Sequence, residues 1–343
     1  MPARAIACKP VQAGETAVAF ILTERRPLAG PNLRKWAPLL VLVAICIVFT
    51  LINPNFMSVR NIARIGIIAA PSLLIAIGVS FIIIMGSIDL SMEGTVAFCA
   101  VVFATAFLAL GGTLATGWAA IPLALVVGTL VGLVNGLIHV KLKIPSFMAS
   151  LSIGFVGLGA TYILSGGYRI TVQDPTFRSL LTVRVLEMPL MVYVALAGLA
   201  FAWFIETRTV LGRNIYAIGG GEELAKASGL NVGRVRIAAF GLAGLFYGLG
   251  ALLSVARIGI ADGDSGSNQM FTAITAVVVG GTSLMGGSGG VLNTLVGVLI
   301  VAAITNGMIV AGLPSYVQSG VLGVIVIVAV GLSTNRAANL LVK

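Results

Sequence analysis

The sequence predicts an all-α, polytopic membrane protein, and three observations support this fold class. First, 58% of the 343 residues are apolar, only 9% are charged, and the mean hydropathy is +1.09. Globular domains are about 25% charged, so this chain has too few charges to cover a soluble surface. Second, the charges are confined to short segments between long apolar runs. Third, the 43 glycines show no triplet repeat, which excludes collagen and suits close helix packing in lipid.

About ten membrane spans are predicted from the apolar runs, because a helix needs about 20 residues to cross the hydrocarbon. Two runs are long enough for several spans: Gly94–Val140 holds two, and Ser265–Asn335 holds three. The other runs hold one span each: Trp36–Val59, Ile65–Ile88, Ile144–Tyr168, Met188–Ile205 and Ile237–Ala256. Within the glycine-rich run 265–335, a re-entrant or broken helix could resemble a span.

The distribution of Lys and Arg predicts the orientation. With the N-terminus inside, the inner segments carry 15 Lys and Arg and the outer segments carry 6. Cytoplasmic loops are enriched in positive charge, so both termini are predicted to be inside. The predicted organisation is a polar cytoplasmic tail at 1–35, a transmembrane domain at 36–335 with an inner loop at 206–236, and a cytoplasmic tail at 336–343. The net charge of +10 is explained by this topology, and no nucleic-acid partner is expected.

Motifs for catalysis are absent from the sequence. The chain contains no Gly-Lys pair and therefore no G-x-x-x-x-G-K-[ST] phosphate loop, so it is not expected to hydrolyse ATP. Cys8, Cys46, Cys99 and the single His139 form no metal-ligand pattern. We expect a transporter or channel without enzyme activity, catalytic residues or a metal site.

Two carboxylates interrupt an apolar stretch at Asp89 and Glu93. Intramembrane carboxylates are costly and usually face protein or water, so Asp89, Ser91 and Glu93 are candidates for lining a solute pathway. The four-residue spacing would place both carboxylates on one face if the segment is helical. An alternative of equal weight is a short turn at the inner face, in which Asp89 and Ser91 cap the next span.

Small residues recur at four-residue spacing on two predicted spans. Such stripes let helices approach closely, so helix packing is the expected role. Asn135 lies beside the first stripe and could either face a polar cavity in the solute pathway or bond across helices. The stripe residues are Gly128, Gly132 and Gly136 on one span and Gly244 and Gly248 on the other.

Three sequence blocks follow one another along most of the chain. They are Gly-Ser-Ile-Asp-Leu-Ser at 86–91, Thr-Arg-Thr-Val-Leu-Gly-Arg-Asn-Ile-Tyr-Ala-Ile-Gly-Gly at 207–220, and Val-Val-Gly-Gly-Thr-Ser-Leu-Met-Gly-Gly-Ser-Gly at 278–289. Asn-Pro-Asn-Phe at 53–56 precedes them. With these blocks, the chain from about Leu51 to Asn335 resembles the permease subunits of bacterial ABC sugar importers of the ribose type. That family includes importers of ribose, xylose, arabinose, galactosides and autoinducer-2.

The resemblance implies a function and a set of partners. A permease of this family carries a monosaccharide or related small polar solute across the inner membrane as a multi-pass subunit. Separate cytoplasmic ABC ATPase subunits would bind ATP, so this chain would need no cofactor of its own. A periplasmic solute-binding protein would deliver the solute. A second permease, identical or sister, would complete the pathway within the membrane lipid.

The resemblance also implies a coupling helix. In the family, the segment after Ala-Ile-Gly-Gly forms the short cytoplasmic helix that docks on the ATPase. Carried over, the ATPase-coupling residues here are Glu222, Glu223, Ala225, Lys226, Ser228 and Gly229. The residues themselves agree with this role, because they lie in the longest inner loop between spans and Gly229 can end a helix in a left-handed conformation.

The sequence is also compatible with other functions. The same fold could import a non-sugar solute such as a branched-chain amino acid, a nucleoside or a signal molecule. A different class, an ion-coupled secondary transporter, would use Asp89 and Glu93 as coupling carboxylates. A passive channel would need no energy source. Uptake that persists without an ATPase and collapses with the ion gradient would contradict the ABC hypothesis.

Overall fold

The computed structural model describes residues 31–314, 317, 320–321, 323–324 and 327. The chain divides into two units, Met1–Ala37 and Pro38–Lys343. Of the first unit, residues 31–37 are described, and they form the beginning of helix α1 (Pro31–Ile52). The predicted tails at 1–35 and 336–343 fall largely outside the described residues. The rest of the fold belongs to the second unit.

Seven helices in the described part of the chain are long and apolar enough to cross a membrane. They are α2 (Val59–Ile84), α3 (Met92–Ala109), α5 (Ala120–Leu142), α6 (Ser146–Ser165), α8 (Leu190–Arg208), α11 (Val232–Ile258) and α13 (Val291–Val310). Each overlaps a run predicted to hold a span, although several of them, α2, α8 and α11 included, extend beyond the predicted bounds. The run Gly94–Val140 contains two of them, α3 and α5, as predicted. Helix α1 adds a shorter apolar helix at Trp36–Ile52.

The run 265–335 differs from the prediction of three full spans. Its first helix, α12 (Gln269–Val279), has only 11 residues and is about 16 Å long, which is too short to cross the hydrocarbon. A capped polar turn at Asp262 precedes it, and Gly281 follows it with φ +99°. Helix α13 has span length, and the third predicted span lies mostly outside the described residues. The total of ten spans therefore stays a prediction.

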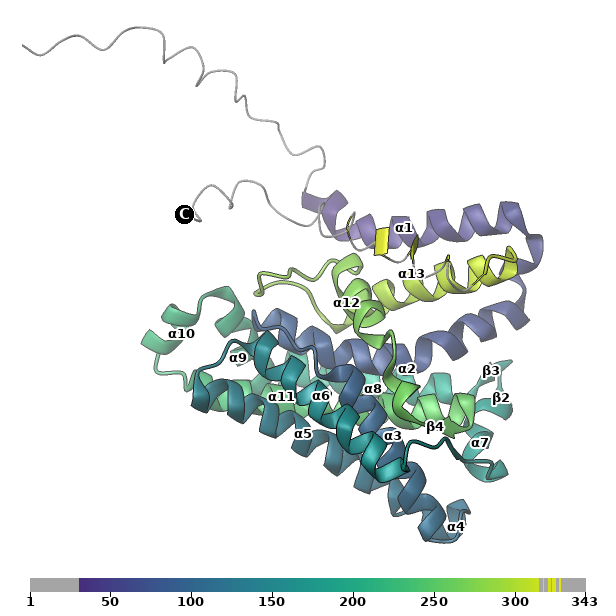
Figure 1. The fold of residues 1–343 in the computed structure, drawn as a ribbon. Coiled ribbons are helices and arrows are strands. Elements are labelled where there is room, and N and C mark those ends of the chain that lie inside the picture. Colours follow the sequence, from purple (N-terminus) through teal and green to yellow (C-terminus); the bar gives the residue numbers. More distant parts are fainter. Residues whose placement is uncertain (1–30, 315–316, 318–319, 322, 325–326, 328–343) are drawn as a thin grey trace, which may run out of the picture. The chain divides into compact units, whose positions relative to one another are not determined.

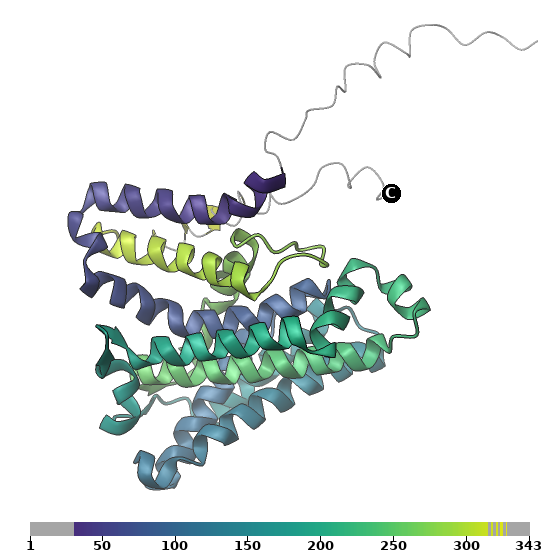
Figure 2. The same cartoon turned by 180° about the vertical axis from the view of Figure 1, so that it is seen from behind.

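Helix α2 is central to the second unit. It is apolar on all sides, and 89% of its most apolar window is buried, against 28% for α5, α6 and α8. In both views α13 lies between α1 and α2, while α8 and α11 lie on the other side of α2 (Figures 1 and 2). The outer helices thus leave apolar side chains exposed, as expected where lipid replaces water as the solvent.

The predicted glycine stripes face one another across α5 and α11. A Cβ atom at Gly244 would lie 2.0 Å from the carbonyl oxygen of Gly128, and one at Gly132 would lie 2.1 Å from the carbonyl oxygen of Phe240. A Cβ atom at Gly136 would lie 2.9 Å from the Cα of Ile237 in α11, and Gly248 packs on α5. Any side chain at these central positions would push the two backbones apart.

Short elements gather at the two ends of the long helices (Figure 1). One end carries α9 (Val210–Gly220), α10 (Glu222–Ala227) and the turn at 280–290 between α12 and α13. The opposite end carries η1 (Pro54–Met57), α4 (Leu114–Gly117), α7 (Pro175–Thr182) and two small antiparallel pairs. In one pair, β1 (Ile170–Thr171) joins β4 (Ile260–Ala261), with Ile170 opposite Ala261. In the other, β2 (Arg184–Val185) joins β3 (Met188–Pro189). The turn η2 (Gly263–Gly266) packs on α3.

Candidate functional site

A buried carboxylate lies in the non-helical segment 85–91 between α2 and α3. Asp89 is 2% exposed. Its Oδ1 accepts hydrogen bonds from the backbone N–H of Ser91 at 2.8 Å, the hydroxyl of Ser91 at 2.7 Å and Nδ2 of Asn135 at 3.3 Å. Its Oδ2 accepts one from the hydroxyl of Tyr247 at 2.9 Å. The network joins segment 85–91 to α5 and α11, and no ion pair to Asp89 occurs among the described residues.

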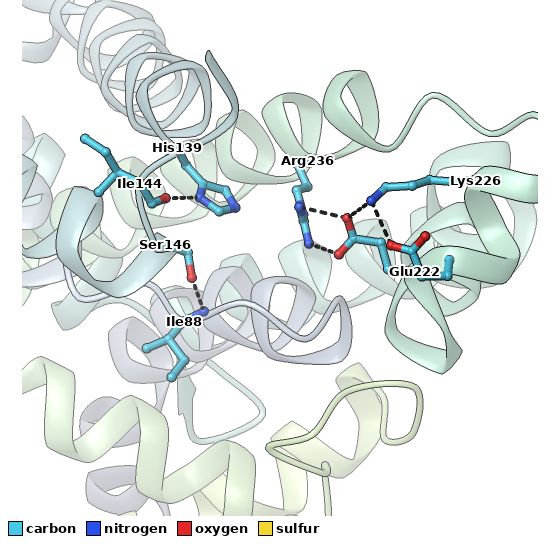
Figure 3. Close-up of polar contacts among 8 residues, drawn as sticks. Ile88, His139, Ile144, Ser146, Glu222, Lys226 and Arg236 are labelled. Atoms are coloured by element: carbon cyan, nitrogen blue, oxygen red, sulfur yellow. Dashed lines mark hydrogen bonds and ion pairs between the residues drawn. The ribbon is translucent and has the colours of Figure 1, made fainter. Parts of the chain in front are cut away.

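The backbone of segment 85–91 is bonded to the start of α6. The N–H of Ile88 donates to the hydroxyl of Ser146 at 3.0 Å (Figure 3), and that of Leu90 donates to the hydroxyl of Ser150 at 2.9 Å. A helix break within a membrane protein exposes backbone groups that must find partners in the protein. The two serines supply those partners. The segment is therefore fixed by α6 through its backbone and by α5 and α11 through Asp89, and it is not a solvated turn.

The structure thus brings together three of the four candidate pathway residues, Asp89, Ser91 and Asn135. Ser91 occupies the N-cap position of α3, but its side chain makes no capping hydrogen bond. The condition under which Asp89 and Glu93 would share a helical face is not met, because α3 begins at Met92 and Asp89 lies before it. The spacing argument fails because it requires continuous helix through residues 89–93.

Glu93 belongs to a different contact. Its carboxylate accepts a hydrogen bond from the N–H of Met270 at 3.3 Å, in the first turn of α12. Gly266 packs directly on it, and a Cβ there would lie 2.0 Å from the carbonyl oxygen of Glu93. Glu93 therefore links the beginning of α3 to the short α12, and it remains partly exposed.

The predicted coupling residues lie on α10 and the turn after it, at the end of the fold that carries α9 (Figures 1 and 3). Glu222 forms ion pairs with Lys226 at 2.9 Å and with Arg236 of α11 at 2.6 Å. Lys226 also pairs with Glu223 at 3.1 Å. The hydrogen bond from Lys226, followed by the charge of Arg236, lowers the pKa of Glu222, and the bond to Glu222 raises the pKa of Lys226. Glu222 thus anchors α10 to α11.

Helix α10 has an inner and an outer face. Ala225 is buried, whereas Leu224 is 75% exposed and the side chain of Glu223 is 88% exposed. Gly229 ends the helix with φ +83°, and its N–H donates to the carbonyl of Lys226. The Leu230 N–H reaches back to the Ala225 carbonyl, which completes a Schellman cap. The hydroxyl of Ser228 donates to the Leu224 carbonyl within the same turn.

The end of α9 is packed against the end of α2. A Cβ atom at Gly219 would lie 1.9 Å from the carbonyl oxygen of Ile84 and 2.5 Å from the backbone nitrogen of Gly287. The N–H of Gly287 donates to that same Ile84 carbonyl at 2.8 Å. The end of α9, the end of α2 and the turn at 280–290 therefore pack here with their backbones in direct contact. Ile84 is the last residue of α2, five residues before Asp89.

Sequence reasoning missed four residues that join these elements: Glu206, Tyr216, Gly219 and Tyr247. Tyr247 lies within an apolar run, where a tyrosine is expected to be a core residue, and nothing in the sequence pairs it with Asp89. Tyr216 and Gly219 belong to the block at 207–220, and Glu206 is the carboxylate that directly precedes it. Carboxylates at the ends of apolar runs are therefore the signal that could have identified Glu206.

No described group of three or more His, Cys, Asp or Glu side chains could hold a metal ion. A cavity between α2, α12 and α13 has a volume of about 20 Å³ and is lined partly by Ser72, Thr272 and Thr305. This space holds about one water molecule and is far too small for a sugar. At the opposite end, an open hollow of about 520 Å³ lies beside β1 and the start of α7.

Comparison with known proteins places the chain among bacterial permeases. Residues 61–330 match the family described as "Branched-chain amino acid transport system / permease component". The ribose import permease protein RbsC of Haemophilus influenzae is 35% identical over 309 residues, covering 87% of this chain and 91% of that protein. The galactose/methyl galactoside import permease protein MglC of Escherichia coli is 34% identical over 315 residues, covering 88% and 93%. RbsC of Bacillus subtilis is 33% identical, covering 89% and 94%. No solved structure matches the chain significantly.

Proposed function

Because the chain belongs to the family of permease components of branched-chain amino acid transport systems, we propose that it is the membrane subunit of an ABC importer for a monosaccharide or a related small polar solute. It is a multi-pass protein of the bacterial inner membrane. One observation carries the sugar assignment: relatives 33–35% identical over most of both chains are import permeases for ribose and for galactose or methyl galactoside.

The partners follow from the same proposal. ATPase subunits dock on α10, where Glu223 and Leu224 are exposed. A solute-binding protein docks at the opposite end, which carries α4, α7 and the small strand pairs (Figure 1). With α10 in the cytoplasm, the loop at 206–236 is inside, in agreement with the bias in Lys and Arg.

A second permease subunit completes the solute pathway. The cavity of about 20 Å³ between α2, α12 and α13 cannot hold a sugar, so it is not the solute pathway in this proposal. Asp89 and Asn135 then act from within each subunit, where they maintain the break between α2 and α3. Glu93, which is partly exposed beside α12, is the pathway candidate with access to a solute.

Alternating access in this proposal begins at α10. ATP binding brings the ATPase subunits together and moves α10 with α9. Gly219 of α9 lies against the last residue of α2, so the motion passes to segment 85–91 without an intervening side chain. A chain of packed elements with two arrangements is the physical requirement for such coupling.

Transport in reconstituted vesicles tests the proposal. The permease is reconstituted with the ATPase and binding protein of its importer, and uptake of labelled ribose, galactose and leucine is measured with and without internal ATP. ATP-dependent uptake of a sugar is expected. Uptake of leucine alone would move the solute to the amino acids of the family description. Uptake that needs no ATPase and follows an ion gradient would overturn the ABC assignment.

A further inference from the structure

A second buried carboxylate, that of Glu206, lies near the end of α8. Glu206 is 9% exposed. Its Oε2 accepts a hydrogen bond from the backbone N–H of Val291 at 3.2 Å, at the first residue of α13. The N-cap of α13 is Gly290, which has no side chain to cap the helix. Glu206 supplies the missing acceptor from another helix, where a negative charge also suits the helix dipole.

The same carboxylate reaches α9. The hydroxyl of Tyr216 donates to Oε1 of Glu206 and lies 2.8 Å from the carbonyl oxygen of Gly289. Burial, followed by the neighbouring Glu206, raises the pKa of Tyr216 well above its ordinary value, so the phenol keeps its proton and remains a donor. Its one proton is shared between the Glu206 carboxylate and the Gly289 carbonyl. The first of these accepts a hydrogen bond from the first residue of α13, and the second directly precedes the N-cap of α13.

The absence of a side chain at Gly290 leaves room for the contact between Glu206 and Tyr216. A Cβ atom at Gly290 would lie 2.8 Å from Oε1 of Glu206 and 3.5 Å from the hydroxyl of Tyr216. Glycine is therefore the residue that lets the carboxylate reach both partners. Three elements meet at two side chains here: α8 through Glu206, α9 through Tyr216, and α13 through its first turn.

We propose that Glu206 and Tyr216 are positioning residues that transmit the position of the coupling segment (residues 210–229) to α13. This inference rests on the proposed function, because it assigns a second route by which α9 moves the membrane helices. The route through Gly219 leads to α2, and the route through Tyr216 leads to α13. Two routes from one short helix would make α2 and α13 move together, and both helices line the small cavity that they share with α12.

The test removes the hydroxyl and measures coupling. In vesicles that contain the whole transporter, Tyr216→Phe should leave ATP hydrolysis within about twofold of the unaltered protein. Sugar uptake per ATP should fall about tenfold, as expected for the loss of a hydrogen bond to a charged group. Glu206→Gln keeps an acceptor and the side-chain shape, so it should give a smaller loss in the same ratio. If Tyr216→Phe is not recovered as folded protein, Glu206→Gln carries the test.

Thr207→Val is the matched control. Its hydroxyl donates only within its own helix, to the Trp203 carbonyl at 2.7 Å, and it lies one residue from Glu206. The variant should retain the uptake-to-ATP ratio of the unaltered protein. A loss of the ratio in Thr207→Val equal to that in Tyr216→Phe would overturn the proposal, because any hydroxyl removed near the end of α8 would then have the same effect.

A second measurement separates this inference from the proposed function. Amide hydrogen exchange of the permease alone in detergent should become faster at the first turn of α13, residues 290–294, in Tyr216→Phe but not in Thr207→Val. If the unaltered transporter shows no ATP-driven uptake, the proposed function fails while exchange still decides whether Tyr216 holds α13. Unchanged exchange at α13, or an unchanged uptake-to-ATP ratio in a working transporter, refutes the positioning role.

Discussion

Replacing Gly244 by alanine is expected to force α5 and α11 apart. The new Cβ would lie 2.0 Å from the carbonyl oxygen of Gly128 and 3.2 Å from the Cα of Gly132. Ordinary van der Waals contact begins near 3.4 Å, so the backbones must separate by about 1.4 Å. Neither neighbour is a flexible side chain that could turn away. Overpacking of this kind costs about 2 kcal/mol, which is a factor of about 30 in the folded-to-unfolded ratio.

Denaturant unfolding of the purified permease in detergent measures this cost. The matched control is Gly159→Ala on α6, where no heavy atom lies within 4 Å of the new Cβ. The control should be neutral or gain up to about 1 kcal/mol, because alanine favours helix over glycine. If the Gly244 and Gly159 variants unfold at the same denaturant concentration, close backbone approach does not stabilise the α5–α11 pair.

Four further predictions concern the candidate site. Asp89→Ala leaves buried donors without an acceptor, which costs about 1–3 kcal/mol for each donor. It should therefore reduce transport and stability more than Glu93→Ala does. Equal tolerance of both variants in an uptake assay would show that the buried network is dispensable. Because the pKa of Glu222 is lowered in the folded protein, its ion pairs should hold α10 at every pH above the ordinary pKa of 4.5. As the pH falls through the lowered pKa, α10 should be released, and proteolysis of residues 221–230 should become faster. The same acid sensitivity in Glu222→Gln would show that Glu222 is not its origin. Charge reversal at Glu223 should uncouple ATP hydrolysis from uptake without unfolding the protein, and normal coupling would remove it from the docking surface. Gly229→Pro should also uncouple the two activities, whereas Gly229→Asn, which tolerates the left-handed conformation, should retain most uptake; equal losses in both would show that the cap at φ +83° is not the cause.

Much of the fold follows from local properties of the chain. A run of about 20 apolar residues can satisfy its backbone in lipid only as a helix, so the runs at Ile65–Ile88 and Ile144–Tyr168 predicted α2 and α6 without any knowledge of their neighbours. The short helix α12 within the run 265–335 has a physical cause as well. Hydropathy does not distinguish a full span from a short helix that starts within the protein, because both bury apolar side chains. The polar turn before Gln269 ends the apolar segment on that side, so α12 is a short helix and not a full span.

The glycine stripes were also predictable in position, although their partners were not. A four-residue spacing places Gly128 and Gly132 on one helical face, which follows from the period of the helix. Which backbone they touch depends on how α5 and α11 cross. That crossing is decided by the packing of both helices, and the sequence of either one does not contain it.

The candidate site divides in the same way. The residues that carry charge in a nearly uncharged chain could be selected by composition: Asp89, Glu93 and the cluster at 222–226 stand out because each ionised group in a membrane protein must have a partner or a function. The partners are a different matter. Tyr247 follows Asp89 by 158 residues and Val291 follows Glu206 by 85, and no local pattern links positions so far apart.

Composition and periodicity therefore determined the membrane class, most of the spans and the list of exceptional charges, because these depend on the transfer of short segments into lipid. The tertiary structure alone decided that Asp89 is enclosed by α5 and α11, that Glu93 turns to α12, and that Glu206 joins α9 to α13. Each of these contacts is a hydrogen bond between distant segments. Such a bond exists only once long helices have packed, since packing sets which polar groups lie within hydrogen-bonding distance of each other.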